Sequence, residues 1–518
     1  MKLALVGAGA SAVALLDGIS RAAAPPPERI TVFDPAERPW CGRPYGDDLA
    51  SVRVNILPEH MSVRSGESGH FSAWLRSRGM GGEDLDFAAA DRFPPRRVYG
   101  RYLSETAGEA AARLKERGCR VELVRQRVVS AFTLDGEGVA DDAGEIGGVW
   151  LSTTTGGVSR ADRVVLAVGA GRPADHYGLT GTEGFHPDPY PLERTLRRID
   201  SEADVAVLGT GLAAVDTAVS LLAAGHRGRV VMASRSGSLP AVRQTPAEVS
   251  LTACAPEMLR GITADGRRLG LDDVARLLAG DIRAEGGDPG SLLTEIEAVE
   301  CEPAARRLRR QLGRIGDPDP GVRLAQKAIP ASGPDLWVRL TPEAQRLVRT
   351  RYHRVLQSLC CPVPPGNARI LLEAIDSGRL TVHSGLWNAK PTAVGGVDVF
   401  TDDGVFHAAE VVNAVAAPSH RNPPRAKELV DGLVSAGLAE RHPAGGLSVD
   451  PDTSRALAPG RAESPVFVIG DLAAGTLYFT SGMPSVVDRA ANIARALAAD
   501  SADTRRTAPL TAARRDAV

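Results

Sequence analysis

The sequence has few cysteines and almost no net charge, and each shortage excludes a class of protein. Six of the 518 residues are cysteine, and none are spaced as a metal site or a Cys-x-x-Cys redox pair. This excludes a disulfide-rich secreted scaffold and predicts free thiols in a reducing compartment. A formal net charge of −2 leaves no basic excess for binding nucleic acid through bulk charge. We expect no metal and no nucleic acid.

Long apolar runs are also missing. The run that follows Met1 is interrupted at Asp17 and Gly18, before the roughly 18 apolar residues that a membrane span requires. We therefore expect no membrane association and a cytoplasmic location. With 43% apolar and 24% charged residues, the chain has the composition of a globular protein. Its length predicts two to four domains of about 100–200 residues each.

The first 34 residues have the pattern of a β-α-β dinucleotide site. An apolar strand at 3–6 leads into a Gly-x-Gly-x-x-Ala turn, then a helix, then a strand at 30–33 that ends at an acid. The glycines permit a tight turn and close approach of a pyrophosphate, and the helix N-terminus supplies free N–H groups. The predicted contacts are Gly7, Gly9, Ala10, Ser11, Ala12 and Asp34, whose carboxylate would accept hydrogen bonds from a ribose.

The pattern recurs in mid-chain, which predicts a second dinucleotide site. A strand at 205–208 precedes the turn Gly209-Thr210-Gly211, a helix and a strand at 229–233. Ser234-Arg235 replaces the acid, and a hydroxyl with a guanidinium suits a 2′-phosphate. NADPH is therefore favoured over NADH. The predicted contacts are Gly209, Gly211, Ala214 and Arg235.

A third apolar strand, at 466–469, is followed by Asp471. Ligands of open α/β sheets bind outside the carboxyl ends of the strands, so Asp471 is predicted to contact a cofactor's sugar or ribityl hydroxyls. A purely structural aspartate at the end of a strand is the alternative.

Together these motifs resemble a bacterial branch of FAD/NAD(P)-binding proteins with two dinucleotide sites. The resemblance is carried by VNILP at 54–58, HFSAWL at 70–75, PRRVYGRYL at 95–103 and GTGLAAVD at 209–216. That branch includes flavin-dependent N-hydroxylating monooxygenases, some acting on amino acids such as aspartate, and urate-hydroxylase-like proteins. The resemblance covers roughly 1–250 and 370–495. It implies FAD in the first site, NADPH in the second, and Asn55 near the isoalloxazine; loop capping is the alternative role for Asn55.

The expected fold is α/β, with tandem Rossmann-like domains and a helical insert. The predicted ranges are 1–200 for the first part of the FAD domain, 201–410 for the NADPH domain with an insert at about 251–350, 411–498 for the return to the FAD domain, and 499–518 for a disordered tail. The insert departs from the branch, and we expect it to cap the cleft as a helical subdomain.

The resemblance implies an FAD-dependent, NADPH-consuming monooxygenase that hydroxylates a small polar metabolite, such as the amino nitrogen of aspartate, in a biosynthetic pathway such as that of an antibiotic. The expected partners are a small-molecule substrate and O2; homo-oligomerisation stays open, as does a disulfide between Cys360 and Cys361. No catalytic side chain is identified. The alternatives are an NADPH-dependent reductase without oxygenation, an amine oxidase and a non-catalytic flavin-binding protein.

Overall fold

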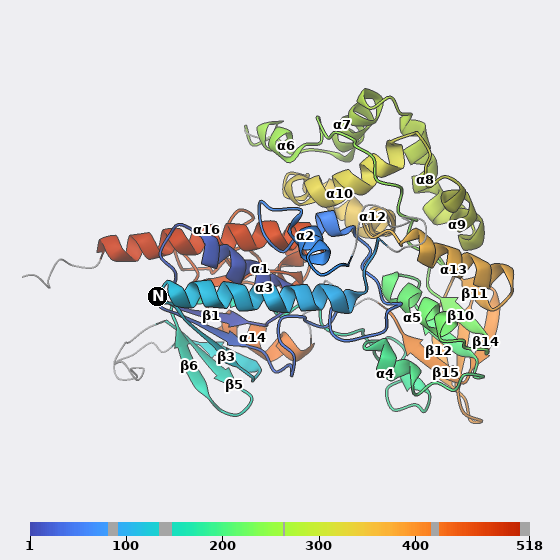
Figure 1. Ribbon diagram of the computed structural model, residues 1–518, viewed down its shortest axis with the longest axis horizontal. Helices are drawn as coiled ribbons and strands as arrows, with labels where there is room; N and C mark the ends of the chain where they lie inside the picture. The colour runs from blue at the N-terminus through green and yellow to red at the C-terminus, as the bar shows by residue number, and fades with distance from the viewer. Residues whose placement is uncertain (81–91, 134–147, 263–264, 416–423, 508–518) are drawn as a thin grey trace, which may run out of the picture.

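The computed structural model describes residues 1–80, 92–133, 148–262, 265–415 and 424–507. Two five-stranded parallel sheets lie side by side, and helices group at the top of the view in Figure 1. In spatial order, the first sheet contains β16 (Val466–Val468), β7 (Arg163–Leu166), β1 (Lys2–Val6), β2 (Arg29–Phe33) and β3 (Arg120–Val124). The second contains β11 (Leu380–His383), β10 (Val230–Ala233), β9 (Val205–Leu208), β15 (Glu410–Asn413) and β8 (Phe185–His186).

The first sheet is buried on both faces, which explains the unbroken apolar run of β1. Leu3 and Leu5 face a helical layer, and Ala4 and Val6 face the opposite layer. The helical layer contains α1 (Ala10–Arg21), α3 (Arg96–Glu116) and α16 (Met483–Thr507) (Figure 1). The opposite layer contains the antiparallel strands β4 (Val128–Phe132), β5 (Val149–Thr153) and β6 (Val158–Ala161), with α14 (Lys427–Ser435).

The second sheet repeats this architecture. Val205 and Val207 pack against helices, whereas Ala206 and Leu208 pack against three antiparallel strands. The helices are α5 (Leu212–Ala223), α9 (Ala304–Gly313) and α13 (Pro365–Asp376), and the strands are β12 (Asn388–Pro391), β13 (Val397–Thr401) and β14 (Gly404–Ala408). In each sheet the glycine turn follows the central strand, so both turns lie at carboxyl edges of strands, where nucleotides bind.

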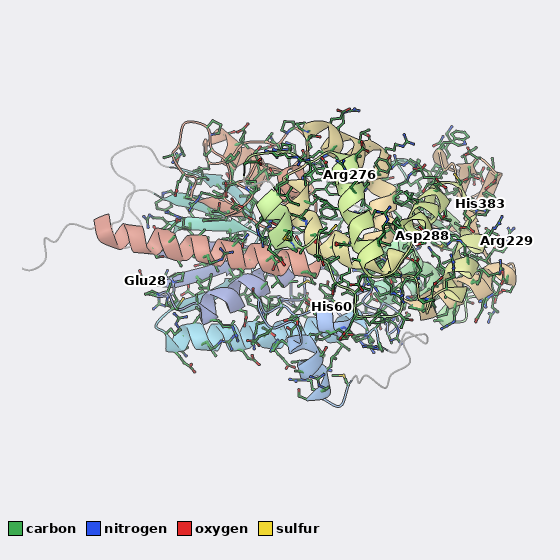
Figure 2. All side chains as sticks on the ribbon, turned by 90° about the horizontal axis from the view of Figure 1, so that it is seen from above. Glu28, His60, Arg229, Arg276, Asp288 and His383 are labelled. Atoms are coloured by element: carbon green, nitrogen blue, oxygen red, sulfur yellow. The ribbon has the colours of Figure 1, made fainter. Side chains whose placement is uncertain are left out.

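The insert is helical, as expected, and its helices continue beyond residue 350. They are α6 (Pro256–Ile262), α7 (Leu271–Ala284), α8 (Pro289–Cys301), α9, α10 (Gly321–Trp337), α11 (Pro342–Leu347), a π-helical turn η2 (Val348–Tyr352) and α12 (His353–Cys360). Viewed from above, this group lies beside α16, and His60 lies where it meets the first half of the molecule (Figure 2). His60 ends the short helix η1 (Pro58–His60).

Two predicted boundaries need correction. Strands β8 and β15 both belong to the second sheet, so that sheet extends past 201–410 at both ends. The expected disordered tail is also wrong for 499–507, which continue α16. The reason is Asp500, whose carboxylate pairs with Arg163 at 2.6 Å and with Arg455 at 2.6 Å. Residues 508–518 of the predicted tail lie outside the described residues.

Candidate functional site

The first glycine turn has the geometry that its sequence predicts. Gly7 has φ +105°, and a Cβ there would overlap the carbonyl oxygen of Ala167 on the neighbouring chain segment. Gly9 is the N-cap of α1, and the nearest atom to a Cβ added there is the Cα of Gly42, at 3.7 Å. Ala12 is fully buried in the helix behind the turn. Ala10 and Ser11 begin the helix, where backbone N–H groups lack intrahelical acceptors.

Asp34 lies beside this turn. Its Oδ2 accepts a hydrogen bond from the Ala8 N–H at 2.7 Å, and its Oδ1 accepts one from the Ala36 N–H at 2.8 Å. The carboxylate therefore ties the end of β2 to the glycine turn, at the position expected for a ribose contact.

An open groove of about 460 Å³ adjoins the turn. It lies between α3 and the loop that follows β2, with Trp40, Tyr45, Arg97 and Arg101 among its lining residues. Gly100 lets these two elements meet, because a Cβ there would overlap the Tyr45 carbonyl oxygen. The sequence analysis did not identify this groove, although the PRRVYGRYL string that carried the resemblance supplies one wall.

The second glycine turn is equally suited to a phosphate. Gly209 has φ +115°, and a Cβ there would lie 2.9 Å from the carbonyl oxygen of Ala414. Gly211 is the N-cap of α5, and a Cβ there would meet no atom within 4 Å. Ala214 is fully buried. Both turns thus pair a position restricted to glycine with a helix N-terminus, a combination that fits a dinucleotide pyrophosphate.

The residues after β10 complete this second site. The hydroxyl oxygens of Thr210 and Ser234 lie 2.9 Å apart, and the Ser234 hydroxyl also accepts the Gly237 N–H at 3.0 Å. Arg235 follows on the surface with its side chain exposed. This arrangement leaves a hydroxyl-lined turn and a guanidinium at the place predicted for the 2′-phosphate.

Asn55 and Arg243 join the two halves of the molecule. The Arg243 Nε–H donates to the Asn55 carbonyl oxygen at 2.8 Å. Arg243 is held by backbone pairing, because its N–H donates to the Val363 carbonyl oxygen at 2.9 Å. Burial lowers its pKa to about 10, opposed only by Cys361 and Cys360. Among the described residues, no carboxylate pairs with the Arg243 guanidinium. No motif in the sequence marks Arg243, because only the fold brings it to Asn55.

A second cation, Arg349, lies on aromatic rings. Trp337 and Tyr478 stack with centroids 4.3 Å apart, and the Arg349 guanidinium lies 4.6 Å from the Trp337 ring centroid. Arg349 also donates to the Gly475 carbonyl oxygen at 2.6 Å. Burial lowers its pKa. The described part of the chain provides no carboxylate for this guanidinium either.

Asp471 precedes Tyr478 on the same return segment. It begins the 3-10 turn η4 (Asp471–Ala473) at the carboxyl edge of the first sheet, just after β16. The Thr480 hydroxyl donates to its Oδ1 at 3.0 Å, and burial raises the pKa of its carboxyl group. The position agrees with the predicted sugar contact; the contact itself stays a prediction. His353, which begins α12, bonds through Nδ1 to the Tyr478 hydroxyl at 2.7 Å.

A buried ion pair fixes the two glycine turns relative to each other. Arg96 on α3 and Asp216 on α5 approach to 2.7 Å, and the Tyr190 hydroxyl donates to the same carboxylate. The Asp216 carboxylate raises the pKa of Arg96. Both ions lie in strings that carried the resemblance, PRRVYGRYL and GTGLAAVD, so that signal was present in the sequence.

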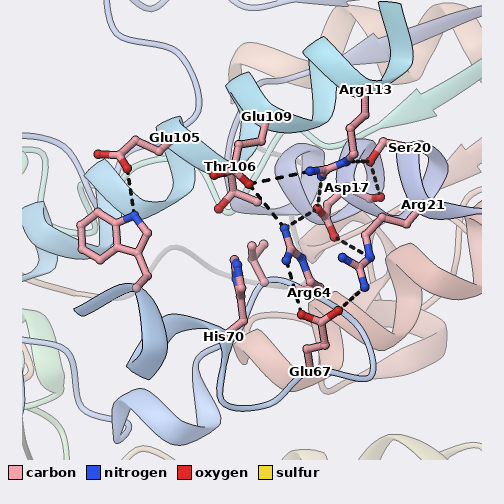
Figure 3. A network of polar contacts seen from close by, with 12 residues as sticks. Asp17, Ser20, Arg21, Arg64, Glu67, His70, Glu105, Thr106, Glu109 and Arg113 are labelled. Atoms are coloured by element: carbon pink, nitrogen blue, oxygen red, sulfur yellow. Dashed lines mark hydrogen bonds and ion pairs between the residues drawn. The ribbon is translucent and has the colours of Figure 1, made fainter. Parts of the chain in front are cut away.

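A second network holds the segment that follows Asn55 (Figure 3). Asp17 on α1 is 1% exposed and accepts from Arg113 on α3 at 2.8 Å and from Arg64 at 3.3 Å. Arg64 also reaches Glu67 at 3.3 Å. These bonds tie the loop at 61–67 to both helices, and so position the chain between Asn55 and α2 (His70–Arg76).

Comparison with known proteins was made through family models, curated sequences and solved structures. Residues 4–171 match the model of a family described as FAD-NAD(P)-binding. No curated protein matches. The chain is similar in structure to an L-lysine 6-monooxygenase from Pseudomonas syringae (17% identity, TM-score 0.59) and to the ornithine hydroxylase of Pseudomonas aeruginosa in its reduced form (15%, 0.58). Each match covers 96% of this chain and 98% of the other.

A third match is the ornithine N-hydroxylase of Kutzneria sp. 744, described with reduced FAD, NADP⁺ and L-ornithine. It is 15% identical, with a TM-score of 0.58, and covers 98% of this chain and 99% of that one. The chain has the two-dinucleotide flavoprotein fold. The predicted fold class is thereby confirmed, and the family match confirms the cofactor class, FAD with NAD(P), for the first domain.

The described residues contain no group of three or more His, Cys, Asp or Glu side chains placed to hold a metal ion. Within the same residues, no helix combines the length and apolar character needed to cross a membrane.

Proposed function

We propose that the chain is an FAD-dependent, NADPH-consuming monooxygenase that hydroxylates the amino nitrogen of a small acidic amino acid, with aspartate the first to test. The fold supports the reaction class, because solved structures with this fold include hydroxylases of ornithine and lysine. When bound, the flavin and nicotinamide supply the redox chemistry, and the protein supplies position, charge and exclusion of water.

The two glycine turns divide the cofactors between them. FAD would bind at the first turn, and NADPH at the second. The proposed FAD contacts are Gly7, Gly9, Ala10, Ser11, Ala12, Asp34, Asn55 and Asp471, and the proposed NADPH contacts are Gly209, Gly211, Ala214 and Arg235. The free N–H groups at the start of α1 and α5 would bind the phosphates, and Arg235 would bind the 2′-phosphate.

The acidic substrate is supported by two desolvated arginines, Arg243 and Arg349. Arg307 is also buried, and its guanidinium reaches the Glu295 carboxylate at 2.7 Å. Arg243 and Arg349 are instead desolvated without a carboxylate among the described residues. A buried charge is costly unless it is paired, and a guanidinium binds a carboxylate through parallel hydrogen bonds. These two cations therefore favour a substrate with two carboxylates, such as aspartate, over the substrates of the named neighbours, ornithine and lysine, which carry one carboxylate each.

The test uses the purified, FAD-loaded protein with NADPH and O2. L-Aspartate, L-glutamate, L-ornithine, L-lysine and cadaverine are compared by NADPH consumption and by mass spectrometry of the product. We expect an oxygenated product from aspartate. NADPH consumption without any oxygenated product would instead identify the reductase alternative, and no NADPH consumption would leave only flavin binding.

A variant tests the role of Arg243 in substrate binding. Loss of one charged hydrogen-bonding group costs about 1.5–3 kcal/mol, so Arg243→Gln should raise the KM for aspartate by roughly 10- to 150-fold. The matched control is Arg351→Gln, because Arg351 is exposed and its guanidinium carbon lies 5.7 Å from the ring centroid of its neighbour Tyr352. Equal KM values for the two variants would refute the assignment.

A further inference from the structure

Cys360 and Cys361 lie at the C-terminal end of α12, and the proposed reaction uses neither thiol. Cys360 is the last residue of the helix, Cys361 follows it as the C-cap, and their Sγ atoms are 3.4 Å apart. Both residues are half-buried. Because the two residues are adjacent in the sequence, no movement of one element against another is needed to bring the sulfurs together.

The surroundings of Cys360 and Cys361 shift the pKa values of the two thiols in opposite directions. The Sγ atoms of Cys360 and Cys361 share a hydrogen bond, and this bond, together with the nearby Arg243 guanidinium, lowers the pKa of Cys361. The same hydrogen bond and burial raise the pKa of Cys360. Burial raises the pKa of two other thiols, to about 11 for Cys119 and about 12 for Cys254. A thiolate is the reactive form of cysteine, so Cys361 is set apart as the nucleophile and Cys360 as the thiol beside it.

We propose that Cys360 and Cys361 form a peroxide-reactive dithiol that closes into a vicinal disulfide beside Arg243. The Cys361 thiolate attacks one oxygen of hydrogen peroxide, the O–O bond breaks, and the departing hydroxide takes a proton to become water. The resulting sulfenic acid is attacked by the sulfur of Cys360, which forms the S–S bond, loses its proton and releases a second water. The pair loses two electrons, and peroxide is reduced to two waters.

The test exposes the full-length, FAD-loaded protein to hydrogen peroxide and follows it by peptide mass spectrometry after alkylation and trypsin digestion. The peptide spanning residues 355–369 contains both cysteines and no other. We expect this peptide to become resistant to alkylation and about 2 Da lighter, and dithiothreitol to reverse both changes. Cys301, which is exposed and lies on another helix, is the internal reference. The pair should react at least about 10-fold faster than Cys301, as expected for a thiolate.

Single variants assign the two steps. Cys360→Ser should leave a sulfenic acid at Cys361 that dimedone traps, whereas Cys361→Ser should slow peroxide consumption to the rate of Cys301. Cys301→Ser is the matched control and should leave the oxidation of 355–369 unchanged. A peptide that stays fully alkylated while Cys301 is oxidised would overturn the proposal. So would a Cys361→Ser variant that reacts as fast as the unaltered protein. Neither outcome depends on the substrate or on hydroxylase activity.

Discussion

Gly211→Ala tests the second nucleotide site without disturbing the protein that carries it. Gly211 has φ −77° and ψ −172°, an extended conformation that alanine adopts. The added methyl group would meet no atom within 4 Å. We therefore expect the free energy of unfolding to change by no more than about 0.5 kcal/mol, as for a substitution that removes no contact.

The same methyl group lies where a pyrophosphate must approach the N-terminus of α5. An extra methyl group in a close-packed contact costs about 1–3 kcal/mol. At 1.4 kcal/mol for each tenfold change, the Kd for NADPH should rise roughly 5- to 150-fold. Binding of FAD should be unchanged, because the first turn lies on the other sheet.

The assay combines calorimetric titration of the FAD-loaded protein with NADPH, measurement of bound FAD by absorbance, and denaturant unfolding. Gly9→Ala is the reciprocal variant: its methyl group has only the Cα of Gly42 as a neighbour, at 3.7 Å, and it should weaken FAD binding at unchanged stability. Gly209→Ala is the steric control, because its positive φ and the Ala414 carbonyl oxygen predict a loss of stability. A Gly211→Ala protein that binds NADPH with unaltered affinity would refute a pyrophosphate at this turn.

Three further predictions concern stability, each measured by denaturant unfolding. Asp17→Ala leaves Arg64 and Arg113 without their buried acceptor and should lower the free energy of unfolding by about 3–5 kcal/mol. Glu109→Ala removes a half-exposed carboxylate from the same arginines and should lower it by at most about 1 kcal/mol. Equal losses for the two variants would argue against the buried network. Arg96→Ala breaks the buried pair with Asp216 and should also lower the free energy of unfolding by about 3–5 kcal/mol. Arg197→Ala, which breaks an exposed pair with Glu193, should lower it by at most about 1 kcal/mol. A loss for Arg96→Ala no larger than that of Arg197→Ala would contradict its bridging role. Burial and, after it, Arg349 lower the pKa of His442 below its usual 6.5, so the unfolded chain binds this proton at a higher pH than the folded chain. The free energy of unfolding should therefore rise with pH through the interval just below 6.5. His442→Gln should reduce that rise, and an unchanged slope would exclude His442 as its source.

The sequence alone predicted the glycine turns and the apolar strands, because both depend on local backbone geometry and burial. The glycine turns at Gly7 and Gly209 are visible because a positive φ beside a neighbouring carbonyl restricts a position to glycine. The apolar strands before them are visible because a parallel sheet is buried on both faces. The sequence could not predict the contact between Arg243 and Asn55, which are 188 positions apart, because only the packing of the second half of the molecule against the first creates it.

The error in the C-terminal tail has a similar cause. A polar, unpatterned segment after residue 498 predicts disorder, yet Asp500 is held by Arg163 and Arg455 from the first sheet and its neighbouring strand connection. Arginine is so abundant in this chain that its composition gave no sign of these partners. The vicinal thiols were visible as a pair, but the nearby Arg243 guanidinium was not, because only the fold brings it to them.

Anaerobic titration of the purified protein with FAD and then NADPH tests the central claim most directly. The account predicts that each chain retains a flavin through gel filtration, and that stoichiometric NADPH bleaches its visible absorbance. A protein that stays colourless after incubation with FAD, or whose bound flavin remains oxidised in the presence of NADPH, would contradict the assignment of one dinucleotide to each glycine turn.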